Sequence, residues 1–380
     1  VIANGAIIHT NIKRNLPNYG VFDEQRYFNS ARENSIFTWK NYKIGLLICE
    51  DMWYEDTPKQ LCKLGAQILI TINASPYNIT KDQQRKKIAK ELCLQYKISL
   101  YYVNQVGGQD ELVFDGGSFA MNTQGEITTQ LEYFTNDQFT ITNNSSKFAP
   151  VPSQMEAIYN ALVLSLRDYA NKNNFDKLLL GLSGGIDSAL VAAIAVDALG
   201  RDKLLSVMLP SKYTSDSSKA DALAVAKNLG IRLTDLSIEK ITDAARFSLA
   251  TLIDLSPGSI TDQNIQARAR GLLLMGLSNQ LGALLLSTGN KSENAVGYAT
   301  LYGDMCGGFN PIKDVYKTQV YALATYRKLP QSVITKHPSA ELYFNQKDQD
   351  TLPDYNLLDK ILYHLVEEDL SISAISLKGY

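Results

Sequence analysis

Cys49 is the side chain in this sequence that is best suited to act as a nucleophile. It ends an apolar run over residues 43–49, which reads as a buried strand, and Glu50 and Asp51 follow it directly. A nucleophile can be presented where a strand stops at such a turn, provided that a base or cation, for which Lys13 is a candidate, activates the thiol. Free cysteines are usually small core residues. That interpretation suits the other three cysteines, which are Cys62, Cys93 and Cys306.

A second group of residues could bind phosphate. It is the run Gly181-Leu182-Ser183-Gly184-Gly185-Ile186-Asp187-Ser188. Glycines let the backbone approach an anion closely, and N–H groups at a helix N-terminus converge on it. A carboxylate beside phosphates is repelled unless a cation lies between them, so Asp187 indicates Mg²⁺. The run differs from the G-x-x-x-x-G-K-[ST] loop of kinases and GTPases, and the alternative is a plain strand-to-helix turn with a Ser or Asp N-cap.

Apolar runs that alternate with helical stretches predict an α/β fold for the elements around both groups. In the first half we expect a sheet with helices between its strands. The predicted strands are 43–49, 66–72, 99–103, 114–119 and 128–131, and the predicted helices are 57–64 and 81–96. A polar, proline-containing break over 143–152 indicates a boundary, so we place two domains at 1–146 and 147–380.

The second half repeats the alternation, which predicts a doubly wound parallel sheet. The predicted strands are 177–181, 204–209 and 283–287, and the predicted helices are 154–171, 188–199, 219–229 and 265–280. Ligands bind at the carboxyl ends of strands in such sheets. Cys49 and the glycine-rich run both lie at predicted strand ends, so we expect two sites.

Composition narrows the class of protein. The chain has 380 residues, of which 45% are apolar and 20% charged, as is typical of globular proteins. The net charge of -2 gives no reason to expect nucleic acid or a membrane as partner. Four cysteines without a C-x-x-C pair and three histidines indicate neither a disulfide framework nor a zinc site. We therefore expect a cytoplasmic protein.

The glycine-rich run resembles the S-G-G-x-D-S loop of the N-type ATP pyrophosphatases, which cleave ATP between its α and β phosphates. The runs 264–270, 288–293 and 297–304 extend the resemblance to NAD synthetase, from about residue 150 to the end. The resemblance implies a Rossmann-like fold with ATP and Mg²⁺ bound at residues 181–188.

The same resemblance implies individual roles. ATP would also contact Thr288, Lys317 and Ser339. Asp187 and Glu293 would be the Mg²⁺ ligands, and Asn264, Arg268 and Glu293 would lie near deamido-NAD. For Arg268 and Lys317, the alternative is a solvated helix residue.

The run 13–24, together with Cys-Glu-Asp-x-Trp at 49–53, resembles the nitrilase superfamily, most closely its glutamine amidotransferase members fused to NAD synthetase. That resemblance implies an α-β-β-α sandwich, incomplete at its N-terminus, and a Glu-Lys-Cys triad. Cys49 would be the nucleophile and Lys13 would stabilise the oxyanion. The residues that would bind glutamine are Tyr19, Ser75 and Lys81.

The resemblance places the glutamate of the triad upstream of Lys13, and the sequence begins Val1-Ile2-Ala3-Asn4-Gly5 without it. A basic segment used by family members near the nicotinic acid group is likewise missing after Tyr380. We therefore expect segments to be missing at both ends, with an internal gap near 326–330 as a further alternative. An intact mass well above 42.1 kDa would support this expectation.

Both resemblances together imply a ligase that releases ammonia from glutamine and uses it to amidate ATP-adenylated deamido-NAD. They also imply an ammonia tunnel and a homo-oligomer. Two alternatives stay open at this point. One is another amidoligase with the same loop, such as GMP or asparagine synthetase. The other is a nitrilase-like amidohydrolase whose second half is not catalytic.

Overall fold

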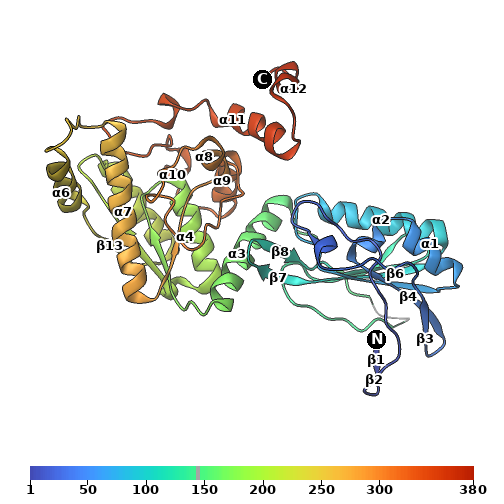
Figure 1. Cartoon of the computed structure of the whole chain (residues 1–380). Coiled ribbons are helices and arrows are strands. Elements are labelled where there is room, and N and C mark those ends of the chain that lie inside the picture. Colours follow the sequence, from blue (N-terminus) through green and yellow to red (C-terminus); the bar gives the residue numbers. More distant parts are fainter. Residues whose placement is uncertain (143–145) are drawn as a thin grey trace. The chain divides into compact units, whose positions relative to one another are not determined.

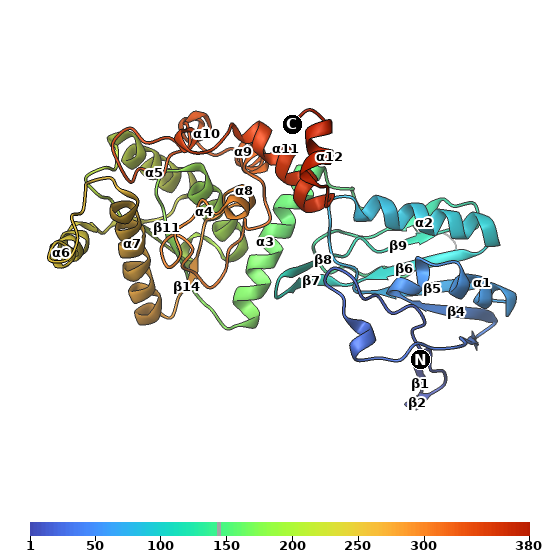
Figure 2. The same ribbon diagram turned by 45° about the horizontal axis from the view of Figure 1, so that its top comes forward.

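The computed structural model describes residues 1–142 and 146–380. The chain divides into two compact units, Val1–Ala161 and Leu162–Tyr380, each of which can be followed along its own ribbon in Figures 1 and 2. The break predicted over 143–152 begins outside the described residues. The domain boundary placed after residue 146 stays a prediction.

The first unit is built on a six-stranded sheet with the strand order β10-β9-β6-β5-β4-β3. The three central strands, β4, β5 and β6, run parallel, so that their carboxyl ends meet at one edge. Antiparallel strands flank them on both sides. The strands are β3 (Ile36–Trp39), β4 (Tyr42–Ile48), β5 (Ile68–Asn73), β6 (Ser99–Asn104), β9 (Phe119–Met121) and β10 (Ile127–Gln130). Two short pairs accompany this sheet, β1 (Ile2–Ala3) with β2 (Ala6–Ile7) and β7 (Val106–Gln109) with β8 (Leu112–Asp115).

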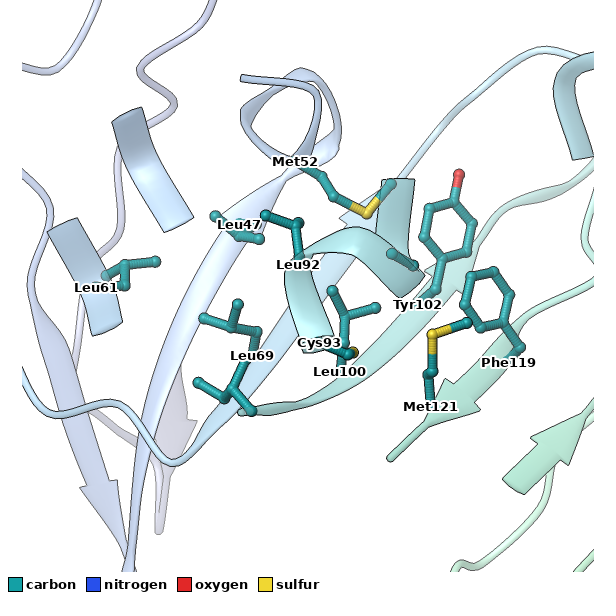
Figure 3. Close-up of a cluster of buried hydrophobic side chains, with 12 residues drawn as sticks. Leu47, Met52, Leu61, Leu69, Leu92, Cys93, Leu100, Tyr102, Phe119 and Met121 are labelled. Atoms are coloured by element: carbon teal, nitrogen blue, oxygen red, sulfur yellow. The ribbon is translucent and has the colours of Figure 1, made fainter. Parts of the chain in front are cut away.

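Two helices, α1 (Asp56–Lys63) and α2 (Lys81–Tyr96), pack on this sheet and bury the core of the unit. Alternate strand residues point toward them, because side chains on a strand alternate between its two faces. Figure 3 shows Leu47, Leu69 and Leu100 from the parallel strands close to Leu92 of α2. This core holds the carboxyl end of β4, where Cys49 follows.

One predicted strand is wrong. Residues 114–119 form the end of β8 and the start of β9, which belong to different sheets. Gly116 and Gly117 separate them with φ angles of 65° and 59°, a left-handed backbone that ends a strand. A Cβ on Gly117 would lie 2.4 Å from the ring of Tyr133, so the turn also needs glycine for space.

The second unit contains a four-stranded parallel sheet with the order β13-β12-β11-β14. Its strands are β11 (Leu178–Gly181), β12 (Leu204–Met208), β13 (Leu233–Asp235) and β14 (Leu284–Leu286). Helix α4 (Ile186–Leu199) packs on one face and α7 (Ile260–Leu281) on the other, as Figures 1 and 2 show. The strand order reverses between β11 and β14, which is where ligands bind in such sheets. The predicted α/β class and doubly wound sheet are confirmed.

The described residues also form other helices. They are α3 (Gln154–Lys172), α5 (Asp216–Leu229), α6 (Glu239–Leu249), α8 (Lys291–Val296), α9 (Lys317–Tyr326), α10 (Gln331–Thr335), α11 (Tyr355–Leu362) and α12 (Ile372–Leu377). Helix α7 begins five residues before the predicted start at 265, because Ser259 caps it by accepting the N–H of Asp262. Within residues 1–142 and 146–380, no helix has the length and apolar character needed to cross a membrane.

Candidate active sites in the two units

Cys49 lies at the turn that follows β4. Its φ of 48° is unusual for a residue with a side chain, and a short 3-10 turn over Cys49–Met52 begins there. Backbone held in this region costs about 1–3 kcal/mol and is concentrated at functional sites. The turn places the thiol at the carboxyl edge of the parallel strands, as the sequence predicts.

Asp51 joins this turn to the segment that contains Lys13. Its buried carboxylate accepts the backbone N–H groups of Arg14 at 3.0 Å, Asn15 at 2.8 Å and Ile48 at 3.2 Å. Because three donors are fixed on one side chain, Lys13 is held beside the end of β4. In the acidic turn noted in the sequence, Asp51 therefore serves to hold the Lys13 segment against the end of β4.

Lys13 and Cys49 influence each other electrostatically. Burial raises the pKa of the Cys49 thiol above its usual value, and the Lys13 charge opposes that rise. Both carboxylate oxygens of Glu24 lie 2.6 Å from Lys13 Nζ, and this carboxylate adds to the rise. The sequence interpretation assigned no role to Glu24, although it ends the same run that contains Lys13.

Tyr19 contacts the other acidic residue of the turn. Its hydroxyl donates to Glu50 Oε1 at 2.8 Å, and Glu50 is 6% exposed. A cavity of about 570 Å³ is lined by Tyr19, Glu50 and Tyr54, among other residues. Burial, together with the hydrogen bond to Glu50, raises the pKa of Tyr19, so the phenol stays protonated. Glu50 lines this cavity and directly follows Cys49 in the chain, and the sequence interpretation did not assign it a role in ligand binding.

Ser75 lies on the loop that follows β5, and Lys81 is the first residue of α2. Lys81 Nζ is 4.1 Å from the centre of the Trp53 ring, and burial lowers its pKa while the charges of Glu50 and Cys49 oppose that shift. Ser75 is buried, and the N–H of its neighbour Ala74 hydrogen-bonds the Cys49 sulfur, which lowers the thiol pKa. The structure thus gathers all five predicted residues of this unit around one turn; their individual roles stay predictions.

The glycine-rich loop of the second unit connects β11 to α4, as predicted. The N–H of Gly185 donates to Ser183 Oγ at 3.2 Å, and that of Ser183 donates to Ser188 Oγ at 3.3 Å. Gly184 has a φ of 85°, and a Cβ there would lie 2.3 Å from the carbonyl oxygen of Ser218. The loop therefore packs against the start of α5 and leaves backbone N–H groups at the N-terminus of α4, an arrangement suited to an anion.

Lys317 lies between the two carboxylates expected to bind metal. Its Nζ is 2.5 Å from Asp187 Oδ2 and 3.1 Å from Glu293 Oε1, and the residue is 1% exposed. Burial acts to lower the Lys317 pKa, but the two carboxylates outweigh it and hold that pKa well above its usual value. Burial and the Asp187 charge raise the pKa of Glu293 to about 7. Lys317 is therefore not a solvated helix residue.

The donor set of this cluster fits Mg²⁺. Asp187 and Glu293 converge on one cationic group, and Mg²⁺ is commonly bound by one or two carboxylates together with phosphate oxygens. Asn290, which the sequence interpretation missed, donates to Asp187 Oδ1 at 2.9 Å and is fully buried. The signal for it was the spacing of Asn290 and Glu293, which form a capping box at the start of α8.

Four further predicted residues lie in loops and helices of the second unit. Thr288 follows β14, and Ser339 Oγ donates to the carbonyl of Gln346 at 2.6 Å. Asn264 accepts from Thr300 Oγ1 at 2.8 Å, and Arg268 Nε donates to the carbonyl of Leu301 at 3.2 Å. In the described part of the chain, none of these four side chains hydrogen-bonds to the carboxylates of Asp187 and Glu293 or to Lys317. Arg268 is exposed, so its alternative as a solvated residue stays open.

A separate cavity of about 660 Å³ borders α6 and the start of α7. Its lining includes Arg246 and Asp262, which pair at 2.7 Å between Nε and Oδ1. Neither is a predicted site residue. The two clusters described above are better candidates, because nucleophilic or anion-binding groups converge there.

Two families match this chain. The carbon-nitrogen hydrolase family matches residues 1–145, and the NAD synthase family matches residues 158–379. The "Glutamine-dependent NAD(+) synthetase" of Acinetobacter baylyi is 48% identical, with 100% of this chain and 73% of that protein covered. The protein of the same name from Synechocystis is 45% identical over 96% of this chain and 70% of its own length.

Solved structures give the same result. The glutamine-dependent NAD+ synthetase from Acinetobacter baumannii, in complex with ADP, matches with a TM-score of 0.84 and 43% identity. That match covers 100% of this chain and 72% of the other. The NMN synthetase from Francisella tularensis matches 59% of this chain and 90% of its own, with a TM-score of 0.53 and 29% identity.

Proposed function

Because this chain belongs to the family of glutamine-dependent NAD(+) synthetases, we propose that it amidates deamido-NAD with ammonia taken from glutamine, at the expense of ATP. The observation behind this function is that one chain contains both halves of the chemistry. A cysteine that feels the charge of a nearby lysine lies in the first unit, and a glycine-rich loop with paired carboxylates lies in the second.

In the first unit, we assign Cys49 as the nucleophile. Its sulfur attacks the side-chain amide carbon of glutamine, and the proton lost by the thiol ends on the amide nitrogen. The C–N bond then breaks and ammonia departs. Water hydrolyses the remaining thioester to glutamate and the free Cys49 thiol. Lys13 would stabilise the oxyanion, since its charge already acts on Cys49. Tyr19, Ser75 and Lys81 are the proposed glutamine-binding residues. Glu50 joins them, because its carboxylate lines the cavity and would face the α-ammonium group.

In the second unit, a carboxylate of deamido-NAD attacks the α phosphate of ATP, pyrophosphate leaves, and ammonia then displaces AMP to form the amide. The N–H groups of the 181–188 loop would hold the phosphates, with contributions from Thr288, Lys317 and Ser339. Asp187 and Glu293 would hold Mg²⁺, which screens the phosphate charges when it is bound. Asn264 and Arg268 are proposed to contact deamido-NAD. A tunnel for ammonia, a homo-oligomer and a cytoplasmic location stay predictions.

The two alternatives from the sequence are less well supported. The match to the NAD synthase family over residues 158–379 weighs against GMP or asparagine synthetase. The cluster in which the buried Lys317 pairs with Asp187 and Glu293 weighs against a second half without catalysis, because burying a lysine costs desolvation energy that a non-catalytic domain has no need to bear.

Product formation with different substrates tests this function. The chain is incubated with ATP, Mg²⁺ and either glutamine or ammonium, and with deamido-NAD, nicotinic acid mononucleotide or neither. We expect AMP and NAD with deamido-NAD and either nitrogen source. AMP formed only with nicotinic acid mononucleotide would show that this mononucleotide, and not deamido-NAD, is the substrate. Glutamate released without any AMP would instead support the amidohydrolase.

A further inference from the structure

Arg85 is a buried cation of the first unit that belongs to none of the sites predicted from the sequence. It lies in α2 and is 1% exposed. Its Nη1 lies 2.8 Å from each carboxylate oxygen of Asp115. Its Nη2 donates to the carbonyls of Ser75 at 2.8 Å and Pro76 at 3.0 Å, and its Nε donates to Ser75 Oγ at 3.2 Å. Most of the donors of this side chain are therefore used on one loop.

Asn104 completes the network from the end of β6. Its Oδ1 accepts the N–H of Ser75 at 3.1 Å, while its Nδ2 donates to Asp115 Oδ1 at 3.1 Å and to the carbonyl of Gly116 at 3.2 Å. The N–H, carbonyl and hydroxyl of Ser75 are all bound by Arg85 or Asn104. Arg85 of α2 and Asn104 of β6 thus fix the backbone of Ser75 and Pro76, the two residues after Ala74, and Asp115 of β8 holds both side chains in place.

This loop reaches Cys49 through Ala74. The N–H of Ala74 hydrogen-bonds the sulfur and lowers the thiol pKa, against burial, which raises it. The loop also leads to Lys81, one helical turn before Arg85 in α2. A shift of the 74–76 backbone would therefore change a contact to the nucleophile and the position of Ser75 together.

A role in stability alone does not account for this arrangement. A buried ion pair adds little stability compared with apolar residues of similar size, because removing the charges from water costs about as much as their attraction returns. Helix α2 is also fastened elsewhere, since Lys86 pairs with Asp82 at 2.9 Å and donates to the Tyr133 hydroxyl at 2.6 Å. An apolar pair could fill the space but could not hold three polar groups of Ser75.

We propose that Arg85, Asp115 and Asn104 are positioning residues for glutamine cleavage, which hold the 74–76 loop so that the Ala74 N–H faces Cys49 and Ser75 faces glutamine. This role rests on the proposed function. None of the three touches the reacting atoms; each acts through the loop. Loss of the network should impair the use of glutamine and leave the use of ammonium unchanged.

The test uses the full chain with Arg85 and Asp115 replaced together, as Arg85→Met with Asp115→Leu, so that no unpaired charge is left buried. The charged and titratable groups that face Cys49 stay in place, namely Lys13, Tyr19, Glu24, Glu50, Lys81 and Tyr102. We expect kcat/KM for glutamine to fall by about 100-fold, because a displacement near 1 Å at a reacting centre costs that much. The ammonium-dependent rate should stay the same.

Alkylation of Cys49 by iodoacetamide at a series of pH values reports on the loop without any substrate. The extent of reaction is followed by mass spectrometry of the peptide that contains Cys49. Loss of the Ala74 hydrogen bond should move the midpoint of the alkylation profile to higher pH in the double variant. A purely structural pair would change thermal unfolding but would leave this midpoint in place.

Lys86→Met is the matched control, since Lys86 is the neighbour of Arg85 in α2 and fastens the helix without touching the loop. It should leave glutamine kcat/KM and the alkylation midpoint unchanged. Arg85→Lys keeps the charge but loses the fork of donors, so it should recover only part of the activity. If the double variant does not fold by circular dichroism, Asn104→Ala replaces it, with an expected fall of about 10-fold.

Two results would overturn the proposal. One is a folded double variant that keeps glutamine kcat/KM within twofold of the parent. The other is an unchanged alkylation midpoint in that variant. A parent chain that makes no NAD from either nitrogen source would refute the proposed function instead, and the alkylation series would still decide whether the network positions the loop.

Discussion

The Cys49 turn is organised by side chains, whereas the 181–188 loop is organised by backbone. Around Cys49, the carboxylate of Asp51 and the guanidinium of Arg85 hold two loops in place by bonding to their main chain. In the second unit, glycines bring N–H groups to a helix N-terminus, and Lys317 joins the carboxylates of Asp187 and Glu293.

The difference follows from what each site must do. A thiol that forms a covalent bond needs one atom placed accurately, and buried side chains with several hydrogen bonds can fix it. A polyanion needs many weak donors and a countercharge, which a helix N-terminus and paired carboxylates with a cation provide. Substitutions should therefore separate the two sites by which nitrogen source they affect.

The largest effect is expected from Cys49→Ala. Without the sulfur no thioester can form, so the glutamine-dependent rate should fall by about 10⁴-fold or more. The rate with ammonium should stay the same, because free ammonia bypasses the first unit. Both rates are measured as NAD formed. A loss of both would contradict the division of labour between the units.

Lys317→Met should lower the rates with glutamine and with ammonium by the same factor, roughly 10² to 10³. The substitution leaves the partly exposed carboxylates of Asp187 and Glu293 close together without their cationic partner. Arg327→Met is the control at the C-terminal end of the same helix, since Arg327 caps α9 and forms a partly exposed pair with Asp197 at 2.7 Å. If only the glutamine-dependent rate fell, Lys317 could not belong to the ATP site that both nitrogen sources share.

Gly184→Ala should reduce both rates by about 10-fold or more, because the added Cβ would push α5 away and displace the loop. Gly200→Ala is the control, because it adds the backbone strain of a positive φ without adding a steric contact. Gly200 has a φ of 94°, but a Cβ there meets nothing within 4 Å. That variant should lose about 1 kcal/mol of unfolding free energy in thermal or urea denaturation and keep both rates. Equal activity losses in the two variants would refute the steric explanation.

The smallest effect is expected from Tyr19→Phe, which removes one hydrogen bond to the Glu50 carboxylate. The bond orients the Glu50 carboxylate that is proposed to face the α-ammonium group of glutamine, so KM for glutamine should rise while kcat changes little. The rise should reach at most about 10-fold, which corresponds to losing from binding the whole of a bond of about 1.5 kcal/mol. The rate with ammonium serves as the internal control. A fall in kcat at unchanged KM would show that Tyr19 acts on the chemical step and not on binding.

Much of the fold could be predicted, because the central strands are continuous apolar runs. β4, β5 and β6 in the first unit and β11, β12 and β14 in the second lie within two residues of their predicted bounds. The prediction failed at Gly116 and Gly117, since an apolar run does not reveal that two glycines turn the backbone between two sheets. Short helices such as α8 and α10 have too few residues for a helical period to show.

Functional residues could be predicted where the residue types within one short segment of sequence indicate their chemistry. Cys49 and the 181–188 loop were identified from residue types at the ends of strands. Lys317 was implied only by resemblance, because 130 positions separate it from Asp187, and no local pattern reveals that contact. Arg85 was missed for the same reason, as a lysine-rich and glutamine-rich helix gives no sign that one of its cations is buried.

Asp51 has a consequence for anyone who would transplant the Cys49 site into another scaffold. One carboxylate ties the end of β4 to the backbone of Arg14 and Asn15, so the nucleophile and its lysine are parts of a single rigid piece. Copying the positions of Cys49 and Lys13 alone would omit the Asp51 hydrogen bonds that hold the two segments together. A successful graft must include both peptide segments and the buried acid that joins them.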